Sequence, residues 1–115
     1  MLFKATDEQV QKLAVNAIMA SKPVGLGHFH YDPDHKFEPN QIELVKNKPY
    51  AGVSLDYVRG RMVKLTIHHV KDDLWKFAHS NNPPHYDYQS WCGAYPTWEA
   101  LAKSVPGVEV VKDAG

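Results

Sequence analysis

The sequence predicts an α+β domain: an antiparallel sheet of about four to five strands, with an N-terminal helix and a short C-terminal helix packed on one face. Three observations lead to this fold class. A helical apolar stripe opens the chain, two alternating apolar runs flank Gly60, and a second short helical pattern lies near the end. At 115 residues the chain has the length of one domain, so residues 1–115 are predicted to fold as a single unit.

The first helix is predicted over residues 6–21. Thr6 is followed three residues later by Gln9, which is the pattern of a capping box. Lys22 precedes a proline and is therefore biased toward extended geometry, which should end the helix. The apolar residues recur at the spacing of one helix face: Val10, Leu13, Ala14, Ala17 and Ile18.

Residues 24–31 then have the pattern of a strand in which His28 and His30 share one face. Residues 32–40 contain two prolines and are predicted to form a loop. Residues 41–46 fit a short strand and a single helical turn equally well.

The alternating runs on either side of Gly60 predict a β-hairpin. A two-residue turn at Arg59 and Gly60 would set apolar side chains opposite polar ones, so we expect a loop of three or more residues centred on Gly60. The inner face would then carry Val53, Leu55, Tyr57, Val63, Leu65 and Ile67. The outer face would pair Asp56 with Lys64, Ser54 with Thr66, and Val58 with Met62.

Three more elements complete the sheet and its cover. A third strand should follow a turn at Asp72 and Asp73, with Trp75 and Phe77 facing inward. After a long polar and aromatic loop, Thr97 should cap a short helix, and residues 108–112 should form the last strand. The buried stripe of that helix would be Trp98, Leu101 and Val105.

Composition excludes several classes of function. Thirteen basic and thirteen acidic residues give zero net charge, which argues against duplex nucleic acid as the main partner. The single cysteine, Cys92, cannot form an internal disulfide and fits a reducing cytoplasm. The N-terminus lacks the pattern of a signal peptide, and no apolar run approaches the ~20 residues of a membrane span. We therefore expect a cytoplasmic protein with no membrane partner.

The seven histidines raise the question of a metal site. His28 and His30 would point the same way from a strand, and a third ligand would have to come from another segment. The candidates for that ligand are Asp32, Asp34, His35 and His85. Because no second motif with metal-ligand spacing is present, we favour polar contacts at a pocket rim and assign no metal and no cofactor.

Positive charge gathers at the tip of the predicted hairpin. Arg59 and Arg61 flank Gly60, and Lys64 and His68 would extend the row along the outer face. Guanidinium groups suit phosphate or carboxylate, so these four residues are the predicted contacts of a small anionic ligand. A solvated outer face is the competing interpretation.

Aromatic residues supply candidates for stacking on a base. The loop over residues 80–96 is rich in tyrosine and tryptophan, which either pack on the sheet or form a binding surface. The predicted stacking residues are Phe29, Tyr57, Tyr88 and Trp91. No signature of nucleophilic catalysis surrounds Cys92, so no catalytic residue is predicted and the protein is not expected to be an enzyme.

The stretch "YVRGRMVKLTI", followed at a distance by "YQSWCGAYPTWEAL", resembles small orphan accessory proteins encoded by bacteriophages and prophages; "KPVGLGHFHY" adds to the resemblance. That group has no defined chemistry, so the resemblance implies no residue roles. It implies a context in the host cytoplasm, where such proteins occlude a host protein or sequester a nucleotide immune signal.

The function predicted from the sequence is non-enzymatic capture of a small anionic ligand, with a nucleotide signal as the leading candidate, by a homo-oligomer. One alternative is an inhibitor of a host defence protein that uses the aromatic loop as its contact surface. The other is a metal-dependent enzyme built on His28, His30 and a carboxylate.

Overall fold

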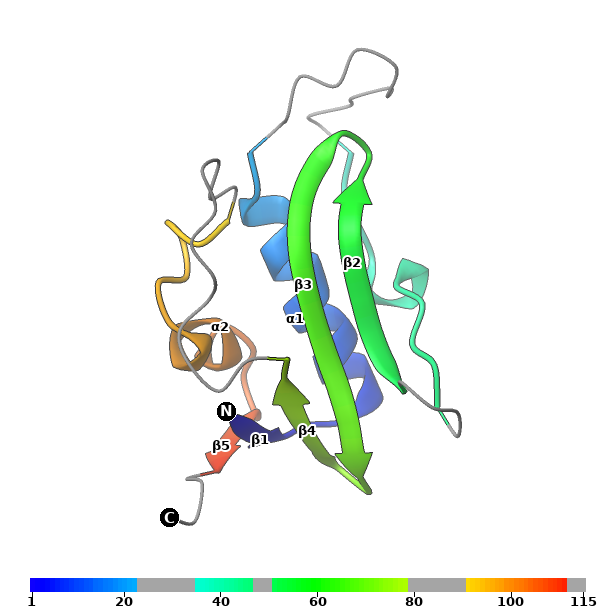
Figure 1. Cartoon of the computed structure of the whole chain (residues 1–115), viewed down its shortest axis with the longest axis vertical. Helices are drawn as coiled ribbons and strands as arrows, with labels where there is room; N and C mark the ends of the chain where they lie inside the picture. Colours follow the sequence, from blue (N-terminus) through cyan, green and yellow to red (C-terminus); the bar gives the residue numbers. More distant parts are fainter. Residues whose placement is uncertain (23–34, 47–50, 79–90, 112–115) are drawn as a thin grey trace.

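The computed structural model describes residues 1–22, 35–46, 51–78 and 91–111. Five strands form one antiparallel sheet in the order β2-β3-β4-β1-β5, covered by two α-helices (Figure 1). This confirms the predicted α+β class. The strands are β1 Leu2–Lys4, β2 Gly52–Val58, β3 Arg61–Lys71, β4 Leu74–Phe77 and β5 Glu109–Val111, and the helices are α1 Asp7–Ala20, α2 Trp98–Lys103 and the 3-10 helix η1 Pro39–Gln41.

Helix α1 begins as the sequence predicts. The Thr6 side chain accepts a hydrogen bond from the Gln9 amide at 3.2 Å, and the Gln9 side chain accepts one from the Thr6 amide at 2.8 Å. This capping box satisfies two amides that the first turn leaves without helical partners. The predicted stripe is fully buried, and the helix ends before Ser21, whose backbone is extended.

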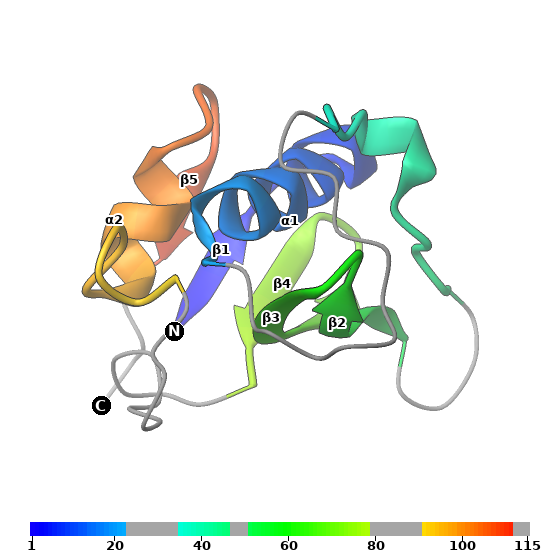
Figure 2. The ribbon, with the colours of Figure 1, turned by 90° about the horizontal axis from the view of Figure 1, so that it is seen from above.

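Both helices pack on the same face of the sheet (Figure 2). The Phe77 ring of β4 stacks on Trp98 of α2 with ring centres 4.4 Å apart, and α1 and α2 are joined by a hydrogen bond from Asn16 to Ser104. The buried faces of β3 and β4 supply the sheet's part of the core, so the inward prediction for Trp75 and Phe77 is confirmed. Core residues with no more than 1% exposure include Phe3, Leu13, Ile18, Leu65, Ile67, Trp75, Phe77 and Leu101.

The hairpin tip differs from the prediction. Val58 pairs with Arg61, which leaves a two-residue turn at Arg59 and Gly60. Both turn residues have positive φ, 49° and 79°, as a type I′ turn requires. The expected wider loop is therefore wrong.

A β-bulge shifts the register by one residue between the tight turn and the rest of the hairpin, so that the inner face of β3 stays buried. Leu55 pairs with Leu65, but Tyr57 pairs with Met62, so two residues of β3 stand opposite Asp56. Lys64 lies in the bulge with φ 51°. The pairing of Val53, Ser54 and Leu55 follows the predicted register, and the predicted pairing of Val58 with Met62 does not occur.

The bulge also moves Tyr57 out of the predicted core. Its side chain is 43% exposed, and the Lys64 ammonium lies 5.9 Å from its ring centre. Val63, Leu65 and Ile67 are fully buried, as expected. The inner-face prediction thus holds for Val63, Leu65 and Ile67 and fails for Tyr57. Met62, predicted on the outer face, is 3% exposed.

Two elements were not fixed by the sequence. Strand β1 pairs with β4 and β5 in the middle of the sheet, although only three residues long. The undecided segment 41–46 contains the end of η1 and then a single bridge between Val45 and Gly52. The predicted strand over residues 24–31 lies outside the described residues.

Candidate functional site

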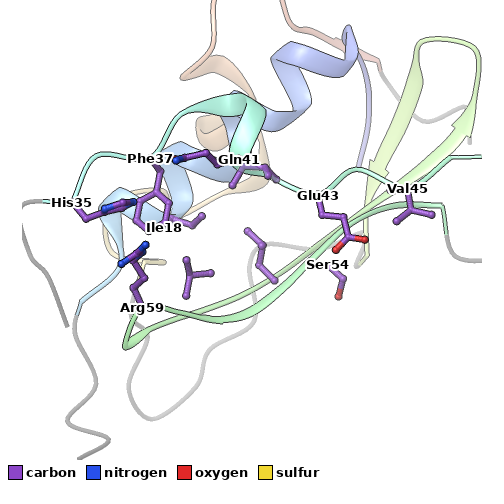
Figure 3. A pocket seen from close by; sticks show the side chains of 12 residues that line it. Ile18, His35, Phe37, Gln41, Glu43, Val45, Ser54 and Arg59 are labelled. Carbon is purple, nitrogen blue, oxygen red and sulfur yellow. The ribbon is translucent and has the colours of Figure 1, made fainter. Parts of the chain in front are cut away.

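A cleft of about 490 Å³ lies between β2, the C-terminal half of α1 and the segment 35–45 (Figure 3). Pockets of this size accept small organic ligands. Its lining is apolar in the middle and polar at both ends. The lining residues are Ile18, His35, Phe37, Gln41, Ile42, Glu43, Val45, Gly52, Ser54, Leu55, Val58 and Arg59.

The cleft exists because the segment 35–45 leaves the edge of β2. Val45 and Gly52 exchange two backbone hydrogen bonds, of 2.9 and 2.7 Å. Continuing that pairing would set Glu43 opposite Ser54, but among the described residues no backbone hydrogen bond joins them.

The diverging segment is held on α1. Gln11 donates a 2.9 Å hydrogen bond to the carbonyl oxygen of Ile42, and the Ile42 side chain is buried against the core. The segment 35–45 and β2 therefore diverge from the bridge between Val45 and Gly52, and the cleft is the space between them.

One end of the cleft carries positive charge. Arg59 points into the cleft toward His35 and Phe37 (Figure 3). It is exposed, and the salt bridges formed within the described ranges do not include it. The His35 and Phe37 rings meet edge to face, with centres 4.5 Å apart. This end can therefore accept an anionic group without first breaking an ion pair of the described residues.

The other end carries Glu43 and Ser54, which lie near each other in Figure 3. Glu43 is exposed and can accept hydrogen bonds from a ligand amine. Between the two ends, Ile18, Leu55 and Val58 supply apolar walls. The cleft thus suits a ligand with an anion at one end, an apolar body and a hydrogen-bond donor at the other end.

Arg61, predicted as a ligand contact, is built into the fold. It is 7% exposed and donates a 2.5 Å hydrogen bond from Nη1 to the carbonyl oxygen of Ser21. That carbonyl follows the last turn of α1, where helices leave acceptors without partners. Arg61 therefore ties the hairpin to the end of α1, and it does not lie on the exposed strip where we expected it.

Lys64 and His68 do not converge with Arg59. Lys64 forms a 2.7 Å salt bridge with Asp56, the predicted outer-face pair. His68 lies opposite Lys76 of β4, on the face of β3 that points away from the helices. The four predicted cationic contacts are thus divided among the cleft, the core and the outer face.

The predicted stacking residues are also separated. Trp91 is 2% exposed, and its indole N–H donates to the carbonyl oxygen of Val63, so it packs inside the fold. Tyr57 is exposed beside Lys64. Phe29 and Tyr88 lie outside the described residues. Phe37 is the aromatic side chain that the structure adds to the site, and nothing periodic around it in the sequence indicates that role.

The metal hypothesis depends on His28 and His30, which lie outside the described residues, as do Asp32, Asp34 and His85. His35, the remaining candidate ligand, is described and lines the cleft. In residues 1–22, 35–46, 51–78 and 91–111, no three histidine, cysteine or acidic side chains gather as metal ligands. Burial raises the pKa of the Cys92 thiol, which disfavours the reactive thiolate. Within the same ranges, no helix has the length and apolar content to cross a bilayer.

Comparison of the chain with protein-family models, with curated proteins and with solved structures gives no match.

Proposed function

We propose that this protein is a non-enzymatic binding protein that captures a small anionic organic ligand in the cleft beside β2. The observation that carries the proposal is Arg59 at the mouth of an apolar cleft, without a salt-bridge partner among the described residues. An anion held there would gain a charge-assisted hydrogen bond, while its apolar body replaces water along Ile18 and Leu55.

A nucleotide meets these requirements and is the ligand class we would test first. Its phosphate would lie at Arg59 and His35, its base along the apolar walls, and an exocyclic amine would donate to Glu43. Sequestration of such a signal in a host cell by a phage-type accessory protein is the biological role we propose. A homo-oligomer, a host protein target and a metal-dependent activity stay predictions.

A thermal-shift screen over mononucleotides, dinucleotides and cyclic nucleotides tests the proposal. A ligand present at a hundred times its Kd should add about 2.7 kcal/mol of stability. Arg59→Gln should abolish that shift, because it removes the charge while keeping a polar side chain. The matched control is Lys103→Gln, which removes one exposed positive charge on α2, away from the cleft lining.

Two results would count against the proposal. If no anion in the screen raises the midpoint, the cleft does not capture ligands of this class. If a nucleotide does so equally in Arg59→Gln and in the unmodified protein, it binds elsewhere. Loss of the shift in Lys76→Gln instead would move the site to the outer face, where Lys76 stands opposite His68.

A further inference from the structure

One wall of the cleft is the edge of β2, where some backbone groups have no backbone partner among the described residues. His69 donates to the Ala51 carbonyl at 2.9 Å, so Ala51 faces β3, whereas Gly52 exchanges both of its bonds with Val45 on the opposite side. Because these directions alternate along a strand, the backbone N–H and C=O of Ser54 point away from β3, toward the cleft. Within the described residues no backbone group pairs with them.

The bridge between Val45 and Gly52 shows that this edge accepts a strand partner. Pairing stops one step later, where the segment 35–45 turns toward α1. Among the described residues, no strand pairs with this edge from Ser54 to Arg59, a length of about 16 Å at ~3.3 Å per residue. That length corresponds to about four or five extended residues.

From these observations we infer that the cleft also takes a second class of ligand, a short extended peptide that adds to the edge of β2. This inference rests on the proposed function, since the terminal carboxylate of the peptide would be the anion that Arg59 binds. The backbone amides of a peptide would pair with the N–H and C=O of Ser54. Its alternate side chains would enter the apolar middle of the cleft beside Leu55 and Val58.

Charge complementarity sets the direction of the peptide. Arg59 lies at the C-terminal end of β2, and Glu43 lies near Ser54, toward the other end (Figure 3). A free carboxylate at Arg59 and a free ammonium near Glu43 require a peptide that runs parallel to β2. Blocking either terminus should therefore weaken binding.

Calorimetric titration with the tetrapeptide Ala-Leu-Ala-Leu tests this inference. The free peptide should bind, and its C-terminal amide should bind at least tenfold more weakly, because the contact with Arg59 is lost. N-methylation should weaken binding at alternate residues only, since every second peptide amide faces β2. This pattern separates strand addition from simple burial of leucine side chains.

A variant of the edge gives an independent readout. Ser54→Pro removes the outward N–H, and proline is tolerated at edge positions whose N–H faces outward. It should abolish tetrapeptide binding, whereas Ser54→Ala, which keeps the N–H and removes only the hydroxyl, should weaken binding much less. Should Ser54→Pro fold poorly, the methylation series on the unmodified protein still decides the question.

The outcomes distinguish the two proposals. If nucleotides or simple anions bind through Arg59 but no tetrapeptide does at millimolar concentration, the peptide inference is wrong and ligand capture stands. If neither binds, both fail. Peptide binding that ignores N-methylation at every position would overturn strand addition.

Discussion

Two arginines two positions apart have different surroundings. Arg59 is exposed at the cleft mouth, whereas Arg61 is buried and bonded to the Ser21 carbonyl oxygen. Arg59 is a residue of the two-residue turn, whereas Arg61 pairs with Val58 and its side chain reaches the carbonyl oxygen that follows the last turn of α1.

This division predicts unequal effects of two substitutions on the free energy of unfolding. Arg61→Leu should lower the free energy of unfolding by about 2 kcal/mol, because it strands a carbonyl that now accepts a hydrogen bond from a charged donor. Arg59→Leu should change stability by less than about 0.5 kcal/mol, as exposed positions usually do. Urea unfolding followed by tryptophan fluorescence measures both. A loss below about 0.5 kcal/mol in Arg61→Leu would contradict the structural role of Arg61.

At the scale of an element, the pairing of β2 with β3 depends on Gly52. It has φ 136°, and a Cβ built on it would lie 1.9 Å from the carbonyl oxygen of Ile67 on the neighbouring strand. No rotation of a side chain can relieve a clash between two backbones. Glycine at this position is therefore a condition for the sheet edge that forms the cleft.

Gly52→Ala should consequently destabilise the protein by about 3 kcal/mol or more, the range of strained backbone combined with a steric clash. Gly93→Ala is the matched control, because among the described residues no atom beyond its two chain neighbours lies within 4 Å of a Cβ built there. The control should unfold within about 0.5 kcal/mol of the original protein. Thermal or urea unfolding of the two variants side by side checks this, and a neutral Gly52→Ala would contradict the described register.

The elements that the sequence predicted best are those whose signals are local. The capping box of α1, the Thr97 cap of α2 and the alternation of β3 each depend on residues close in the chain, and the structure confirms all three. Strand β1 is too short to show alternation, and its pairing with β4 comes from distant residues.

The site was only partly predictable for the same reason. Arg59 was found because arginine beside glycine at a hairpin tip is a local feature. The bulge at Lys64 was not, since nothing in the sequence marks a lysine with positive φ. The cleft between β2 and the segment 35–45 depends on the hydrogen bond from the Gln11 side chain to the Ile42 carbonyl oxygen, which joins residues far apart in the chain.

At the scale of the whole molecule, the reactivity of the Cys92 thiol measures whether the core is folded, because Cys92 belongs to the core. It is 7% exposed, and burial raises its pKa above the ordinary value of 9.0. Its reaction with a thiol reagent at pH 8 should therefore be at least tenfold slower than that of a free thiol, and urea should restore the rate.

The same pKa shift links stability to pH. Because the folded thiol ionises at a higher pH than the unfolded thiol, its contribution to stability is present below pH 9.0 and is lost as pH rises above that value through the folded pKa. Between pH 8 and pH 10, the free energy of unfolding should therefore fall more in the original protein than in Cys92→Ala. An equal change of the unfolding free energy with pH in the two proteins would contradict a buried thiol.

The central claim is that the cleft between β2, α1 and the segment 35–45 is where this protein binds an anionic ligand. A nitrogen–proton correlation titration with a mononucleotide and with Ala-Leu-Ala-Leu tests it most directly. We predict saturable shifts that cluster at His35, Phe37, Ser54 and Arg59. Shifts confined to Thr66, His68 and Lys76 on the outer face, or no saturable shifts with either ligand, would contradict the claim.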